Sequence, residues 1–426
     1  MMGPLVLVWA LQAKVLTLDE AVRTAEIRQP QVRQARASTE AARARADEAR
    51  APLLPQVTGT GTYQRKTSNF APGSITTPGG AGAAASSSFD TFNFWSLAAT
   101  ASQLIWDFEQ SSGKWRAARA SADAQGSTEQ ATRLQVLLTV RTVYFGARAQ
   151  KALVQVARET LENQDRHLKQ IEGFVQVGTR PEIDLAQART DRANAQVQLI
   201  TAENNYETGK AQLNQAMGVE APTDYDVSDE TLPAVQGEEQ GIDALVDESL
   251  KARPEMQSLE RQQRAQMLTL RSTRGAYWPA LGASTGVTDA GRELDNLVWN
   301  WNLTVTLSWP LFQGLLTNAQ VREAEANLAQ IEAQRDALRQ QVRLEVDQAR
   351  LAVRAGKAAL GAAEEALTNA RERLRLAEGR YQTGVGNVIE LGDAQVALTN
   401  AAGQKVQAEY NLASARAQLT KALGRP

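Results

Sequence analysis

Residues 299–309 read Trp-Asn-Trp-Asn-Leu-Thr-Val-Thr-Leu-Ser-Trp, and this stretch decides the fold. Apolar and polar residues alternate along it, which predicts a β-strand because successive side chains of a strand point to opposite faces. Tryptophan at both ends with aliphatic residues between is typical of an outer-membrane barrel strand, and the length suits a tilted bilayer span. A soluble sandwich strand is the alternative, but small Asn, Thr and Ser side chains on the polar face favour a wet lumen.

Three further strands are expected, at residues 57–66, 92–106 and 281–289. The residues between the first two are rich in Gly, Ser, Ala and Pro and are expected to form a flexible loop. Four strands cannot close a barrel alone, and an open edge in lipid would leave backbone groups unpaired. The strands must therefore be shared among several chains. Aromatic residues expected at the membrane interfaces are Trp299, Trp301, Trp309, Trp95 and Trp106.

The chain contains an internal duplication. An offset of 224 residues pairs Gln29 with Arg253, and an offset of 206 residues pairs Gly218 with Gly424. The first repeat covers residues 16–218 and the second covers 241–426. Residues 219–240 join them, with seven acidic residues and no Lys or Arg, and are expected to be a solvated linker. Residues 1–15 are expected to be either a signal peptide or an ordinary apolar N-terminal segment.

Very long helices that pack as coiled coils are expected between these regions. Residues 315–380 contain no Pro, and a continuous helix of that length would be roughly 100 Å long. Apolar positions repeat every seven residues, slip by four at Val346, and resume from Val353 to Leu374. Such a slip locally unwinds a left-handed supercoil. A cytosolic coiled-coil scaffold would share this pattern, but the flanking strands and the duplication argue against it.

Each repeat has a glycine-containing break between helices. Residues 178–185 read Gly-Thr-Arg-Pro-Glu-Ile-Asp-Leu, and residues 384–391 read Gly-Val-Gly-Asn-Val-Ile-Glu-Leu. Glycine ends one helix and Pro181 fits the first turn of the next, so each break predicts a tight helical hairpin. Glu390 and Asp393 are three residues apart and share one helix face. Acids that simply favour the helix dipole in a first turn are the alternative explanation of this pair.

Composition and motifs argue against several classes of function. Lys+Arg 46 against Asp+Glu 48 leave no basic surplus for nucleic acid. The absence of cysteine excludes disulfides, a thiolate metal site and an N-terminal lipid-modified Cys. The single histidine, His167, lies in a helical stretch and is expected on the helix surface. No nucleotide-binding motif is present. The chain is therefore expected not to be an enzyme, with no catalytic, cofactor or metal site.

These residues resemble the TolC family of outer-membrane efflux proteins, from Leu16 to Gly424. The most specific marks are the two breaks and residues 303–314, which read Leu-Thr-Val-Thr-Leu-Ser-Trp-Pro-Leu-Phe-Gln-Gly. The resemblance implies a mixed α+β membrane protein in the outer membrane of a Gram-negative bacterium. It implies a homotrimeric tube, in which each chain gives four strands to a shared twelve-stranded barrel surrounded by lipid. The long helices would form a periplasmic tunnel.

The resemblance also implies partners and site residues. A periplasmic adaptor protein, itself joined to an inner-membrane pump, would dock on the tip of the tunnel. The residues that fall on this tip are Gly178, Thr179, Arg180, Leu185, Gly384, Val385, Val388 and Leu391. Glu390 and Asp393 would ring the periplasmic aperture, and such a ring attracts cations. Gly386 replaces a basic residue found in some members, so a salt bridge that holds the tip shut would be absent.

The implied function is a passive exit duct for small molecules and drugs. Two other ducts are alternatives, one for type I protein secretion and one for metal-ion efflux. One His, five Met and no Cys give metal export no support. A non-channel coiled-coil scaffold is an alternative of another class.

Overall fold

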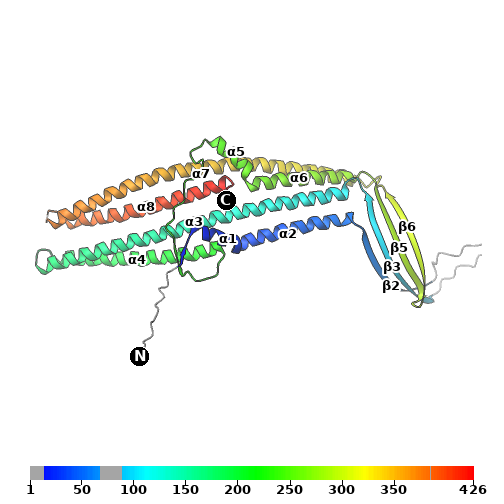
Figure 1. Ribbon diagram of the computed structural model, residues 1–426, viewed down its shortest axis with the longest axis horizontal. Coiled ribbons are helices and arrows are strands. Elements are labelled where there is room, and N and C mark those ends of the chain that lie inside the picture. The colour runs from blue at the N-terminus through cyan, green and yellow to red at the C-terminus, as the bar shows by residue number, and fades with distance from the viewer. Residues whose placement is uncertain (1–13, 68–88, 384) are drawn as a thin grey trace, which may run out of the picture. The chain divides into compact units, whose positions relative to one another are not determined.

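The computed structural model describes residues 14–67, 89–383 and 385–426 (Figure 1). The elements follow one another as β1 (Lys14–Leu16), α1 (Leu18–Arg28), α2 (Pro30–Arg50), the 3-10 turn η1 (Ala51–Leu53), β2 (Gln56–Thr67), β3 (Thr91–Trp106), α3 (Gln110–Gln176), α4 (Glu182–Met217), β4 (Tyr225–Val227), α5 (Ile242–Ala252), α6 (Pro254–Gly275), β5 (Ala280–Glu293), β6 (Asn296–Ser308), α7 (Leu316–Gln382) and α8 (Val388–Ala422). Among the described helices, none is both long and apolar enough to cross a membrane.

The described residues divide into two compact units. The helical unit takes its residues from Met1–Thr39, Ala124–Leu259 and Gln334–Pro426, and the strand unit from Glu40–Asp123 and Glu260–Ala333. The helices α2, α3, α6 and α7 contribute residues to both units.

The strand unit contains a four-stranded antiparallel sheet in the order β2-β3-β5-β6 (Figure 1). The stretch that alternates most regularly in the sequence forms β6, and Trp309 follows directly after its last residue. The expected strand at 281–289 is four residues longer at its C-terminal end, because its pairing with β6 continues to Glu293 opposite Asn296.

The register of the sheet gathers apolar side chains on one face. Trp301 of β6 lies opposite Val287 of β5, and Trp95 of β3 lies opposite Tyr63 of β2. One acid, Asp289 of β5, shares this face opposite Trp299. Residues that alternate with these, chiefly Thr, Ser and Asn, lie on the other face. The apolar face is largely exposed in the single chain: Trp299, Trp301, Leu303, Val305 and Leu307 each expose more than half of their surface. A contiguous apolar face of this kind indicates contact with a membrane or a partner.

The long helices of the helical unit bury the heptad positions that the sequence predicts. Val342 and Val346 are both fully buried, so the inner face of α7 continues through the four-residue slip. Leu367 and Leu374, further along α7, are buried as well. Val140 and Ala147 play the same part in α3, where they pack with residues of α1 and α4.

The duplication is visible in how each repeat holds the C-terminal end of its last helix. Gln29, between α1 and α2, donates from Nε2 to the carbonyl of Ala216 at 2.9 Å. Its counterpart Arg253, between α5 and α6, donates from Nε to the carbonyl of Ala422 at 2.7 Å. The glycines that end these helices, Gly218 and Gly424, have φ of +70° and +72°. Residues paired by the two sequence offsets thus meet in the same way in both repeats.

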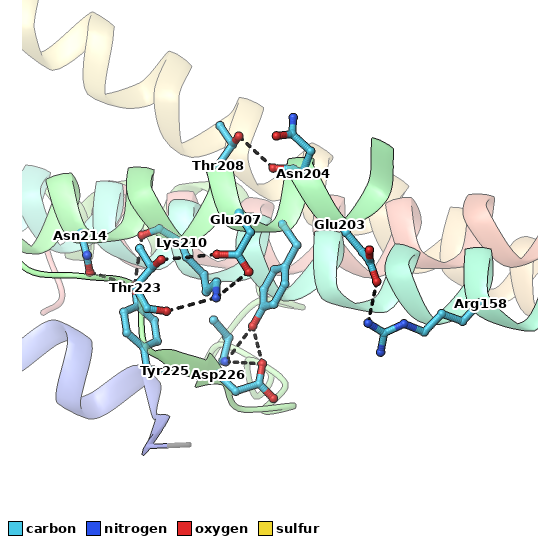
Figure 2. A network of polar contacts seen from close by, with 12 residues as sticks. Arg158, Glu203, Asn204, Glu207, Thr208, Lys210, Asn214, Thr223, Tyr225 and Asp226 are labelled. Carbon is cyan, nitrogen blue, oxygen red and sulfur yellow. Dashed lines mark hydrogen bonds and ion pairs between the residues drawn. The ribbon is translucent and has the colours of Figure 1, made fainter. Parts of the chain in front are cut away.

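The acidic segment between the repeats exposes most of its acids, as a solvated linker would, but parts of it are anchored on the helices. Its strand β4 pairs in parallel with β1. Glu238 is buried and forms ion pairs with Lys357 at 2.7 Å and Arg416 at 3.4 Å. Asp226 accepts a hydrogen bond from the hydroxyl of Tyr206 (Figure 2). Partial burial raises the pKa of Asp226, but hydrogen bonds from Lys151 and Tyr206 outweigh it and hold the pKa below its ordinary value. The acids were visible in the sequence, but their cationic partners on distant helices were not.

Candidate functional site

Two helical hairpins form where the sequence has its breaks. Gly178 adopts φ +74° after α3, and the backbone N–H and the hydroxyl of Thr179 both donate to the carbonyl of Phe174 at 2.9 Å. In the second hairpin the Asn387 side chain accepts from the N–H of Ile389 at 3.1 Å and caps α8. Gly384 lies outside the described residues.

A hydrophobic cluster, here called the hairpin cluster, joins the two hairpins. Its buried members come from all four helices α3, α4, α7 and α8, and they are Ile171, Ala188, Leu374, Ala377, Tyr381, Leu391 and Ala394. Leu185 and Val388 pack against it. Leu391 is only 3% exposed, so in this conformation its side chain is not available to a partner protein. Leu185, Val388 and Leu391, which the resemblance places on the adaptor-contacting tip, thus also pack in the cluster that holds the hairpins together.

Tyr381 collects aromatic and cationic neighbours within the cluster. His167 of α3 contacts its ring edge-on with centroids 5.7 Å apart, and the Arg180 guanidinium lies 5.0 Å from its centroid. The expectation that His167 lies on the helix surface is wrong: it is 7% exposed. The α3 face that carries it is covered by α7, which a single-helix pattern does not reveal. Burial lowers the pKa of His167, although Asp191 and Asp184 oppose this shift.

The two acids that begin α8 have different surroundings. Glu390 forms an ion pair with Arg380 of the preceding helix at 3.4 Å. Asp393 is exposed, makes no ion pair within the described part of the chain, and lines a cavity of about 540 Å³ between α3, α4 and α8. A Cβ on Gly386 would lie 2.8 Å from the backbone nitrogen of Tyr381, so no basic side chain fits there without a shift of the turn. The basic residue next to Glu390 is instead Arg380, which the sequence pattern did not indicate.

Large apolar side chains are exposed on both hairpins. Val177 and Ile183 on the first hairpin are 71% and 74% exposed, and Val385 and Ile389 on the second are 73% and 65% exposed. Gly178 and Thr179 are exposed beside them. Of these four apolar residues, only Val385 was expected from the sequence to contact an adaptor. Each is a Val or Ile inside a break or directly before it, where a bulky apolar residue has no helical face to pack against.

Aromatic residues lie at both ends of the sheet in the strand unit. At the end joined to the helices, Trp106 and Trp309 are more than half exposed, and the Trp309 indole donates to the carbonyl of Tyr277 at 3.2 Å. Trp278 is exposed there as well and stacks on Phe108, which the sequence analysis did not single out. Toward the opposite end of the sheet, where β5 turns into β6, Trp95 packs against Tyr63 with ring centroids 4.5 Å apart, near Trp299 and Trp301.

Comparison with known proteins gives one family. The model of the outer membrane efflux protein family matches residues 21–219 and 245–425. The outer membrane protein TolC of Escherichia coli is 25% identical over 424 residues, which cover 96% of this chain and 82% of the relative. The toluene efflux pump outer membrane protein TtgF of Pseudomonas putida is 26% identical over 426 residues, which cover 98% and 85%. The cation efflux system protein CusC of Escherichia coli is 25% identical over 236 residues, which cover 51% and 48%.

Solved structures share the fold. The outer membrane protein VceC of Vibrio cholerae superposes with a TM-score of 0.81 at 18% identity, covering 96% of both chains. The outer membrane channel CmeC of Campylobacter jejuni superposes with a TM-score of 0.82 at 20% identity, covering 96% of this chain and 85% of that one. The expected mixed α+β, TolC-like fold is thereby confirmed, and together with the family match it shows that this chain belongs to the family of outer membrane efflux proteins.

Proposed function

We propose that this outer-membrane efflux protein works as a homotrimeric channel, a passive exit duct for small molecules. The observation that carries the proposal is the exposed apolar face of a sheet whose outer strands, β2 and β6, each have one edge that no other described strand pairs with. In lipid such edges are costly, because no water satisfies the free backbone groups. A ring of three copies would pair β6 of each chain with β2 of the next and close a barrel of twelve strands.

The helical hairpins are proposed to dock a periplasmic adaptor protein that connects to an inner-membrane pump. The exposed side chains of Val177, Ile183, Val385 and Ile389 supply an apolar surface that a partner could cover. Gly178, Thr179 and Arg180 would complete this surface. Energy for transport would come from the pump, because the sequence contains no nucleotide-binding motif.

The acids at the start of α8 are proposed to form a ring at the periplasmic aperture. Three copies of Glu390 and Asp393 would concentrate negative charge there and attract cations. Because Arg380 lies 3.4 Å from Glu390, part of the Glu390 charge is offset within each chain. Asp393 should therefore contribute most to cation selectivity. Opening would require the hairpins to move apart, driven by an adaptor that binds the open arrangement more tightly than the closed one.

Small organic molecules are the proposed cargo. The relatives that match nearly the whole chain include TtgF, whose name refers to toluene efflux. The relative named for cation efflux matches about half of this chain, so metal-ion export is the weaker candidate. Type I protein secretion remains the second alternative, and gene neighbours would separate these routes. A coiled-coil scaffold would leave the apolar face of the sheet unexplained.

Single-channel recording in planar bilayers tests the proposal. The detergent-purified protein should migrate as a trimer and conduct with a preference for cations. Asp393→Asn should reduce that preference more than Glu390→Gln, and Arg380→Gln should increase it. Asp47→Asn changes an exposed acid of α2 and serves as the matched control with no expected effect. Conductance that none of these changes alters would reject the acidic ring and keep the channel. A monomer that neither inserts nor conducts would reject the channel itself.

A further inference from the structure

Two cations and two aromatic rings meet at the end of the sheet where β5 turns into β6. The helices join the other end, because β2 follows η1 and β3 leads into α3. At the end where β5 turns into β6, the Lys66 ammonium lies 3.6 Å from the ring centroid of Phe94 and 5.8 Å from that of Phe92. The Arg292 guanidinium lies 4.3 Å from the centroid of Phe92. Three strands, β2, β3 and β5, thus contribute to one group of side chains, here called the cationic collar.

The register places the cationic collar on the polar face of the sheet. Lys66 pairs with Phe92, and Gln64 pairs with Phe94, whereas the neighbouring pair Tyr63 and Trp95 belongs to the apolar face. Side chains alternate along each strand, so Lys66, Phe92 and Phe94 point to the same side as the Thr, Ser and Asn residues of the sheet. Arg292 lies where the pairing of β5 with β6 shifts its register, so alternation does not place its side chain, but its contact with the Phe92 ring brings the guanidinium to the same side.

The collar cations are held without using their hydrogen-bond donors. A cation over a ring face is attracted by the ring quadrupole, and this leaves the N–H groups of Lys66 and Arg292 free for other partners. Among the described residues, neither side chain forms an ion pair or donates a hydrogen bond. Glu293 pairs with Asn296 after a register shift in β5, and Asn296 shares a face of β6 with Asn300, so Glu293 lies on the polar face as well and offsets part of the positive charge of the collar. Asp90 and Asp295 lie beyond the strand ends, so they add negative charge near the turns and not along the polar wall.

We propose that the cationic collar is a binding site for small organic anions at the outward end of the channel lumen. The inference rests on the proposed channel, because the polar face lines a lumen only when three copies close the barrel. Twelve strands with a spacing of about 4.8 Å and a tilt of about 40° form a barrel roughly 24 Å across. Six long cationic side chains that reach inward would leave an opening comparable with the Debye length of about 8 Å at physiological salt. Anions that pass would therefore feel the collar.

The collar and the acidic aperture would carry opposite charge at the two ends of one duct. A cation-attracting entrance and an anion-attracting exit make conduction asymmetric, so the current should depend on the sign of the applied voltage. Carboxylate and sulfonate groups pair well with a guanidinium or an ammonium. The collar would thus favour the exit of cargo that carries such a group.

Channel recordings with benzenesulfonate as the probe test this site. Lys66→Gln/Arg292→Gln should weaken the block by benzenesulfonate, added at the end of the barrel where β5 turns into β6, by roughly two- to fivefold, as expected for an exposed charge pair. It should also increase cation selectivity and reduce the current asymmetry. Arg65→Gln is the matched control, since Arg65 is the next residue along β2 but lies on the apolar face, where its Nε donates to Thr91 at 2.8 Å. The control should leave block and selectivity unchanged.

The outcomes separate the collar from the channel. A conducting protein in which the double variant and the Arg65 control behave like the parent would reject the collar and leave the channel standing. An equal effect from Arg65→Gln would also reject it, because the effect would then be general charge at this end and not a site on the polar face. Absence of conductance in the parent would reject the proposed function itself. Phe92→Leu/Phe94→Leu keeps both cations, and we expect it to give a smaller loss of block than removing them.

Discussion

His167 links the stability of the hairpin cluster to pH. It is 7% exposed, and its Nδ1 has no hydrogen-bond partner among the described residues. Burial lowers its pKa below the ordinary value of 6.5. The unfolded chain therefore binds more protons than the folded one in this range, so the free energy of unfolding is highest above about pH 6.5 and falls as the pH drops below it. Protonation works against the packing of His167 on Tyr381.

We expect His167→Gln to reduce this acid sensitivity. Glutamine does not titrate, so the melting temperature of the variant should change less between pH 7 and pH 5 than that of the parent. Circular dichroism at each pH measures both, and the comparison uses the slope, because the substitution also changes the packing at every pH. Parallel curves for the two proteins would show that the imidazole is not the group that titrates.

Gly218 should tolerate no side chain. Its φ of +70° is strained for any L-residue, and a Cβ would lie 2.7 Å from Cα of Gln29. We expect Gly218→Ala to lower the free energy of unfolding by about 2 kcal/mol or more. Gly173→Ala is the control, because Gly173 lies inside α3 with nothing within 4 Å of its Cβ position. That change should stabilise by about 0.5–1 kcal/mol. Similar effects in chemical denaturation would contradict this account.

At the residue scale, sequence patterns located the hairpins better than they assigned side chains within them. The glycines of the breaks predict where α3 and α7 end, since helix termination depends on local conformation. The burial of Leu391 and the ion pair of Glu390 with Arg380 depend instead on how four helices meet. No periodicity within one helix contains that information.

At the scale of elements, a buried arginine that directly follows α5 connects this helix to α7 and α8 of the second repeat. Arg253 is 2% exposed, donates to the carbonyl of Ala422 at the end of α8, and lies 2.6 Å from Glu345 of α7 as an ion pair. Removing one partner of a buried pair leaves the other charge uncompensated. We therefore expect Arg253→Ala to cost about 3–5 kcal/mol of the free energy of unfolding.

An exposed ion pair provides the control for this clamp. Arg274 and Glu325 approach to 2.7 Å, but both side chains are about half exposed. Arg274→Ala should cost less than about 1 kcal/mol, because solvent screens such pairs. The pH dependence gives a second measurement. Burial raises the pKa of Glu345, but Gln341, Arg253 and Lys421 outweigh it and lower the pKa. The stability from Glu345 is thus present above its ordinary pKa and lost as the pH falls below it, and Arg253→Ala should diminish that loss.

Elements were predicted well wherever one face of the element repeats a simple pattern. Alternation predicts β6, and heptads predict the buried face of α7, because each face contacts a single kind of environment. The end of β5 was predicted too early, since its last residues are held by pairing with β6 and not by their own composition. Within the segment at 219–240, the burial of Glu238 between Lys357 and Arg416 was not predictable for the same reason.

At the scale of the whole molecule, the two repeats cap their last helices at the same position but with side chains of different charge. In the first, the neutral amide of Gln29 caps α4, and in the second the charged Arg253 caps α8. Gln29 is neutral and makes no ion pair, whereas Arg253 pairs with Glu345 of α7. Glu345 should therefore add an acid-sensitive contact at the cap of α8 that the neutral Gln29 does not provide at the cap of α4.

The proposed barrel makes one requirement of the sheet: its apolar face must lie against lipid and its polar face against water. Leu303 and Thr304 are adjacent near the middle of β6 and point to opposite faces. An arginine on the lipid face of a barrel near the membrane midplane costs about 2–4 kcal/mol, whereas a lumen position accepts charge and changes selectivity. Leu303→Arg should thus reduce the yield of trimers that resist heating in detergent. Thr304→Arg should assemble normally and lower cation selectivity in bilayer recordings. Because the two changes add the same side chain one residue apart, differences in folding propensity between variants are small. If Thr304→Arg blocked assembly while Leu303→Arg did not, the faces would be reversed and the strands would need a different arrangement in the membrane.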